Sequence, residues 1–135
     1  MARYSERSKM KLATCHKDLQ IVFNVVIKYF DNTIICGNRG EQAQMKAYND
    51  GFSKVKYPNS KHNQLPSMAV DAIPYPIDWK DVNRMRYFAG FVVGIAQVLY
   101  DNKTIKHRVR WGGDWDKDTD LNDQRFNDFP HFELY

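Results

Sequence analysis

The feature that most constrains this 135-residue sequence is one long helical pattern in its second half. Apolar residues recur there at helical spacing, which predicts a helix from about Trp79 to Tyr100 with Asp78 as its N-cap. The apolar run inside it, residues 87–100, is shorter than the ~20 residues of a membrane span, and Gln97 interrupts it. The helix is therefore expected to cover a buried core. Its core stripe consists of Met85, Phe88, Val92, Ile95 and Leu99.

Gly90 and Gly94 form a GxxxG pattern on this helix. In a membrane this pattern brings two helices together, whereas in other proteins small residues let a helix approach a neighbouring surface closely. Because the sequence contains no membrane span, we expect these glycines to pack closely on a sheet.

Shorter helical and strand patterns surround the long helix. Helices are predicted at about residues 8–15, 18–30 and 41–49, the last followed by Gly51 as a C-cap. Strands are predicted at residues 33–36, 69–73, 109–111 and 131–134. This order predicts an α+β fold, with residues 1–135 as a single domain whose small, mostly antiparallel sheet is packed by helices.

The charge is unevenly distributed. Residues 1–110 hold 18 Lys and Arg against 9 Asp and Glu, whereas residues 111–135 hold 2 against 7. A nucleic-acid binder with a uniformly basic surface would not collect its acids in one segment, so nucleic acid is not an expected partner. Two cysteines, Cys15 and Cys36, are too few for a disulfide scaffold, and no apolar signal segment is visible.

Two histidines and a carboxylate are candidate metal ligands. A hydrolytic zinc site needs three protein ligands of the His, Asp or Glu type and leaves one position for water, and His62, Asp71 and His131 could supply them. A carboxylate within the apolar strand that holds Asp71 is costly to bury unless a cation compensates it. The alternatives are an outward-facing Asp71 and a solvent-exposed His62.

A second carboxylate precedes His131 by three residues. Pro130 stiffens the turn between them, so this carboxylate, Asp128, could lie near a metal without binding it. There it could accept a proton from the attacking water and pass it to the leaving amine.

Three separated motifs occur together: Ser60-x-His62, Ala69-x-Asp71 and Asp128-x-x-His131. In this order they resemble the zinc peptidases of the D-Ala-D-Ala carboxypeptidase and L-alanyl-D-glutamate endopeptidase family (peptidase M15), with the phage endolysins as the most similar type. The gap between the first two motifs is two residues longer than the family's and lacks its glycine. The resemblance implies the Hedgehog/D-Ala-D-Ala peptidase-like fold.

The resemblance also implies roles for individual residues. His62, Asp71 and His131 would bind Zn²⁺, and Asp128 would be the catalytic acid and base. The family carries an arginine in a G-x-R context followed by a glutamine, which Arg39 and Gln42 match. The Arg39 guanidinium would bind the scissile carbonyl oxygen or the oxyanion that forms from it. Ser60 would support the loop that carries His62.

The function implied is hydrolysis of peptidoglycan stem peptides, at the bond between L-alanine and D-glutamate, for lysis of the host cell. The alternatives are a D-alanyl-D-alanine carboxypeptidase on the same fold and a non-catalytic, zinc-stabilised wall-binding module. The expected partner is bacterial peptidoglycan, without stable membrane insertion. A monomer is expected, held in the host cytoplasm before release to the wall.

The segment after the third strand is rich in acids and aromatic residues. Trp111 and Trp115 are either walls of a cleft or core residues. Residues 114–123 carry alternating aspartates that invite comparison with a calcium-binding EF-hand loop. Because Thr119 and Arg125 stand where that loop needs Gly and Glu, a solvated acidic loop is favoured.

Overall fold

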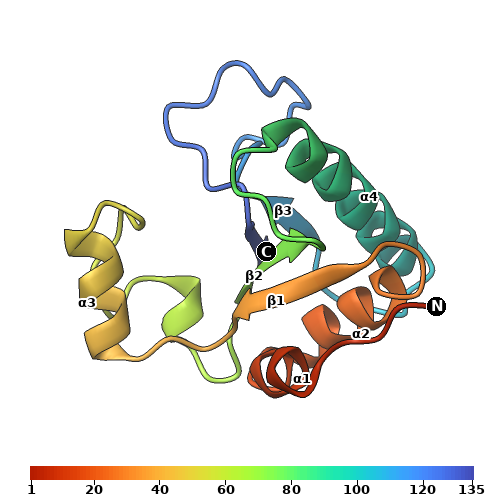
Figure 1. The fold of residues 1–135 in the computed structure, drawn as a ribbon, viewed down its shortest axis with the longest axis horizontal. Helices are drawn as coiled ribbons and strands as arrows, with labels where there is room; N and C mark the ends of the chain where they lie inside the picture. Colours follow the sequence, from red (N-terminus) through yellow and green to blue (C-terminus); the bar gives the residue numbers. More distant parts are fainter.

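Four short strands form one antiparallel sheet in the order β1-β2-β4-β3, and helices pack around it (Figure 1). The computed structural model describes residues 1–135. This α+β architecture confirms the fold class expected from the sequence. The elements are α1 (Glu6–Leu12), α2 (Lys17–Val26), β1 (Asn32–Cys36), α3 (Glu41–Asn49), the 3₁₀ turn η1 (Lys61–Asn63), β2 (Ala69–Pro74), α4 (Val82–Asp101), β3 (Val109–Trp111) and β4 (His131–Leu134).

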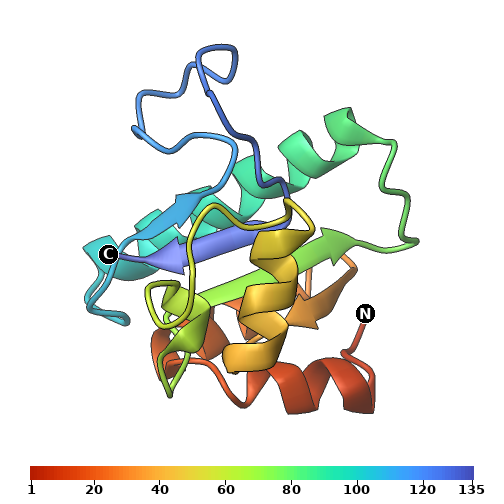
Figure 2. The same ribbon diagram turned by 90° about the vertical axis from the view of Figure 1, so that its left-hand side faces the viewer.

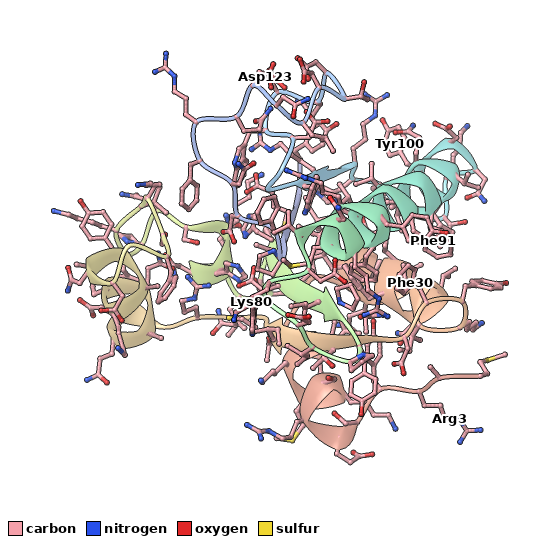
Figure 3. All side chains as sticks on the ribbon, turned by 45° about the horizontal axis from the view of Figure 1, so that its top comes forward. Arg3, Phe30, Lys80, Phe91, Tyr100 and Asp123 are labelled. Atoms are coloured by element: carbon pink, nitrogen blue, oxygen red, sulfur yellow. The ribbon has the colours of Figure 1, made fainter.

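Helices α2 and α4 pack against each other on one face of the sheet, and α1 packs against β1 (Figure 1). The core lies between this helical layer and the strands, because apolar side chains of α2 and α4 pack against apolar side chains from the facing side of β2 and β4. Phe30, just beyond α2, extends this contact to Phe91 on α4, with ring centroids 5.7 Å apart (both labelled in Figure 3). No helix combines the length and the hydropathy that crossing a membrane requires.

The long helix begins one turn later than its sequence pattern predicts. Asp81, not Asp78, is its N-cap, and the Asp81 side chain accepts a hydrogen bond from the backbone N–H of Arg84. Asp78 instead closes a turn by accepting from the backbone N–H of Lys80. The helix predicted over residues 18–30 is also shorter, because after Val26 the backbone continues as tighter turns.

The expectation that Gly90 and Gly94 pack on the sheet is wrong. Both are exposed, and a methyl group added at either would meet no atom within 4 Å. The residues of α4 that enter the core occupy the opposite side of the helix, which leaves the glycines along a groove of about 500 Å³ beside Trp111 and Tyr135.

The strand register decides which side chains share the second face of the sheet. Asp71 on β2 pairs directly with His131 on β4, and Arg110 on β3 pairs with Glu133 on β4. Because side chains alternate along a strand, the neighbouring residue Phe132 points into the core while His131 and Glu133 point to the other face. Helix α3 and turn η1 lie on that side, where Figure 2 shows α3 in front of the strands.

Candidate metal centre and cleft

The structure brings together the three residues that the sequence analysis selected as metal ligands. Nε2 of His62 lies 3.1 Å from Oδ1 of Asp71 and 3.2 Å from Nδ1 of His131, and the last two atoms are 3.4 Å apart. All three side chains are buried. The alternatives, an outward-facing Asp71 and an exposed His62, are therefore wrong.

The outer hydrogen bonds of the two histidines show which ring nitrogens face the cluster. Nδ1 of His62 donates to the carbonyl oxygen of Gly37 at 2.7 Å, and Nε2 of His131 donates to Oε1 of Glu133 at 2.8 Å. In the neutral imidazoles, the remaining nitrogens therefore turn lone pairs toward Oδ1 of Asp71. Three converging acceptors repel one another, so the cluster favours a positive charge at its centre.

A tetrahedral zinc ion fits these distances. With metal–ligand bonds of about 2.0–2.1 Å, two ligand atoms of a tetrahedral site lie about 3.3 Å apart. The three observed separations, 3.1, 3.2 and 3.4 Å, agree with this value. The donor set of two imidazoles and one carboxylate is also typical of hydrolytic zinc sites. The cluster is thus a candidate metal centre.

Electrostatics in the cluster also favour a cation. Burial disfavours the imidazolium form of His62, but the Asp71 carboxylate outweighs this effect and raises the pKa of His62 to about 10. Burial alone would raise the pKa of Asp71, yet the two imidazoles hold it well below its usual range. In the metal-free protein, a proton therefore supplies the positive charge that this group of residues favours.

Asp128 lies beside the cluster without joining it. Its Oδ2 is 3.8 Å from Nδ1 of His131, and burial together with the Asp71 charge raises the pKa of Asp128 to about 6. Two backbone hydrogen bonds hold the Asp128–His131 turn against Gly112. The N–H of Asp128 donates to the carbonyl oxygen of Gly112, and the N–H of Gly112 donates to the carbonyl oxygen of His131. Any side chain at Gly112 would collide with the Asp128 backbone, so glycine is required there.

Arg39 reaches the cluster from the segment after β1. Its Nη2 lies 3.3 Å from Oδ2 of Asp71, and its Nη1 donates to Oε1 of Gln44 at 3.1 Å. The sequence match assigns the family's glutamine to Gln42, but Gln42 is exposed, whereas Gln44 is fully buried and contacts Arg39. The assignment to Gln42 is wrong because position 44, and not 42, lies on the side of α3 that faces Arg39.

Sequence reasoning missed a second buried carboxylate, Glu133. Its Oε1 accepts a hydrogen bond from His131, and its Oε2 accepts one from Nη2 of Arg110 at 2.5 Å. Nζ of Lys61 lies 3.3 Å from the same Oε2. Burial would raise its pKa, but the hydrogen bonds from His131 and Arg110 lower it to about 2. Its position two residues after His131, on the same strand face, was the available signal. Glu133 fixes the ring orientation of His131.

The cluster lies at the base of a cleft of about 460 Å³. Residues 52–55 and 59–62 line this cleft together with Trp115 and Phe126. The Trp115 ring stacks near His131 with centroids 5.4 Å apart, whereas Trp111 is buried in the core and donates from Nε1 to the Phe129 carbonyl. Trp115 is therefore a wall of the cleft and Trp111 a core residue.

Ser60 caps the 3₁₀ turn that carries His62, because its Oγ accepts from the His62 backbone N–H at 3.2 Å. This contact confirms its expected supporting position.

The acidic loop extends away from the body, with Asp123 on its outer bend (Figure 3). Within it, carboxylate oxygens of Asp114, Asp116 and Asp118 can approach one another within 4.8 Å, and Asp114 accepts from the backbone N–H of Thr119.

This arrangement, with three convergent metal-binding side chains and a carboxylate and a guanidinium beside them in a cleft, is typical of metal-dependent hydrolases. Comparison with known proteins gives the family. The model for the phage L-alanyl-D-glutamate peptidase family matches residues 1–135. The chain belongs to this family and is a peptidase, which rules out a non-catalytic wall-binding module.

A solved structure supports the same assignment. The fold is similar to that of the L-Ala D-Glu endopeptidase ChiX from Serratia marcescens, with a TM-score of 0.72 and 25% sequence identity. The similarity covers 98% of this chain and 90% of the Serratia chain. No similar protein is found among the curated proteins. The family favours L-alanyl-D-glutamate cleavage over the D-alanyl-D-alanine carboxypeptidase alternative.

Proposed function

We propose that this peptidase is a zinc-dependent endolysin that hydrolyses the bond between L-alanine and D-glutamate in peptidoglycan stem peptides. His62, Asp71 and His131 would hold the zinc ion. The observation that carries this proposal is the convergence of three acceptor atoms at 3.1–3.4 Å, with Asp128 beside them in the cleft.

The side chains around the cluster divide the work of peptide hydrolysis. A bound zinc ion supplies a Lewis acid, which polarises the scissile carbonyl and acidifies water. Asp128 accepts a proton from the attacking water and returns it to the leaving nitrogen, so the amine departs neutral. In the metal-free protein, burial and the Asp71 charge raise the pKa of Asp128 to about 6, so its position makes this carboxylate more basic than an exposed aspartate.

Arg39 stabilises the oxygen on which negative charge develops. Its guanidinium borders the cleft and stays charged at all relevant pH values. Gln44 fixes one end of this group and Asp71 the other, so the donor needs little reorganisation during the reaction.

We also propose that residues 1–135 form one catalytic domain that acts as a monomer. One core cluster joins α1, α2 and α4 to all four strands, which supports a single cooperative unit. The enzyme would accumulate in the host cytoplasm and reach the wall after release. Analytical ultracentrifugation of the purified protein tests the monomer.

The decisive experiment is a digest of purified peptidoglycan followed by mass spectrometry of the products. We expect new N-terminal D-glutamate ends, loss of cleavage after chelation, and recovery when zinc is added back. Asp128→Asn should bind zinc normally but cleave at a small fraction of the wild-type rate. Release of D-alanine in place of new D-glutamate ends, or cleavage that chelation does not affect, would overturn the proposal.

A further inference from the structure

Four cationic side chains line the cleft: Arg39, Lys54, Lys61 and Arg110. Three of them are already paired with buried carboxylates. Arg39 lies 3.3 Å from Asp71, and both Lys61 and Arg110 pair with Glu133. Each of these three cations is thus held in place by a carboxylate of the protein.

Lys54 is the exception. It forms no ion pair within 4.0 Å, and its ammonium group lies 5.1 Å from the centre of the Phe126 ring. This cation–π contact holds the ammonium beside the Phe126 ring, which also lines the cleft, without neutralising its charge. Lys54 is therefore the one cationic side chain of the cleft that pairs with no carboxylate of the protein.

The substrate class of the proposed function supplies a matching charge, so this inference depends on that function. A glutamate residue has an α-carboxyl and a γ-carboxyl group, and extension of the stem peptide uses only one of them. The other stays as a free carboxylate just beyond the scissile bond. Asp128 also lines the cleft, and its negative charge would repel this group unless a cation faces it.

We propose that Lys54 binds the free carboxylate of the D-glutamate residue and thereby makes the enzyme selective for glutamate over its amide. A charge-assisted contact between an ammonium and a carboxylate discriminates against a neutral amide of the same shape. Lys54 acts as a specificity residue and takes no part in bond breaking.

The chain offers a matched control, Lys56. This lysine lies in the same segment, is exposed, and sits 5.3 Å from the centre of the Tyr48 ring, but it does not line the cleft. Lys54→Met and Lys56→Met thus remove the same charge and the same kind of aromatic contact, at positions that differ only in access to the cleft.

The test measures kcat/KM of the zinc-loaded enzyme on two synthetic peptides. Both carry an L-Ala–D-Glu bond, one with the free carboxylate and one with its primary amide. We expect wild type to prefer the carboxylate peptide, and Lys54→Met to lower kcat/KM for it about tenfold, mainly through KM. The amide peptide should be affected little, Lys54→Arg should keep the preference, and Lys56→Met should behave as wild type.

Two results would overturn the inference while leaving the proposed function intact. Equal losses on both peptides would mean that Lys54 only braces the cleft against Phe126, and unchanged selectivity would mean that it does not face the substrate. If wild type cleaves neither peptide, the proposed function fails and the inference fails with it.

Discussion

Replacing Gln44 with leucine removes the amide that ties Arg39 to the wall of the cleft. Its Oε1 accepts from Arg39 and from Nδ2 of Asn63, both at 3.1 Å. Its Nε2 donates to Oγ of Ser53 at 2.9 Å and to the carbonyl of Val55 at 2.8 Å. The side chain is fully buried, so one residue of α3 connects three separate segments.

The size of the effect follows from these four hydrogen bonds. Leucine fills about the same space, so the cavity contribution is small and the lost polar contacts dominate. A hydrogen bond contributes about 1 kcal/mol net, and Ser53 and Val55 can regain part of theirs from water. We therefore expect Gln44→Leu to lower the free energy of unfolding by about 3 kcal/mol, which corresponds to a Tm about 10 °C lower for a chain of this length.

Thermal unfolding followed by circular dichroism measures this change, with Gln42→Leu as the control. Gln42 is exposed on the same helix, so its replacement should change the Tm by about 1 °C or less. The reasoning is refuted if the two variants have the same Tm, or if Gln42→Leu is the less stable one. Either result would mean that Gln44 does not hold Arg39.

Further expectations concern the metal centre and the two thiols. Glu133→Ala should weaken zinc affinity about 10–100-fold, measured by competition with a chromophoric chelator. Glu133→Gln keeps an acceptor for His131 and should lose less affinity. Equal affinities for Glu133→Ala and wild type would contradict the role of Glu133. Because burial and the Asp71 charge raise the pKa of Asp128 to about 6 in the metal-free protein, its carboxylate should gain a proton there as pH falls through 6, measured by the NMR shift of the carboxyl carbon. Titration of this carboxyl near pH 4 would contradict its buried position beside Asp71. Zinc at 100 times its dissociation constant should stabilise the chelator-treated protein by about 2.7 kcal/mol, measured by urea denaturation, and no shift would argue against a site in the folded state. Cys15 is 2% exposed, and burial raises its pKa to about 12. A thiol reagent should therefore modify Cys36 first in the native metal-free protein, measured by peptide mass mapping. Modification of Cys15 first would be incompatible with its burial.

The sequence predicted the strands and two of the three clustered side chains, Asp71 and His131, because each carries a local signal. Asp71 stands out as a charge within an apolar strand, and His131 begins a short strand after a turn with Pro130. Alternation along β2 and β4 then places Asp71 and His131 on one face, and antiparallel pairing brings them opposite each other. His62 needed the family resemblance, since nothing in its own loop distinguishes it.

Other features depend on information that spacing alone does not hold. Asp78 and Asp81 are both good N-caps one turn apart, and the apolar stripe that begins at Met85 is compatible with either. The choice between Gln42 and Gln44 depends on how α3 is rotated relative to Arg39, which is a tertiary property. The spacing of Gly90 and Gly94 indicates a close helix contact, but it does not show which side of the helix meets the sheet.

The position of β4 has a consequence for when the enzyme becomes active. This strand lies between β2 and β3, although both precede it in the chain. During synthesis, residues 131–134 emerge after every other element of the sheet, so β2 and β3 stay unconnected until β4 inserts between them. The proposed zinc site includes His131 on that same strand, so metal binding at this site would be coupled to the last step of sheet assembly. A chain in which β4 has not formed would lack one proposed metal ligand and the turn that holds Asp128, so peptidase activity would begin only once β4 is in place.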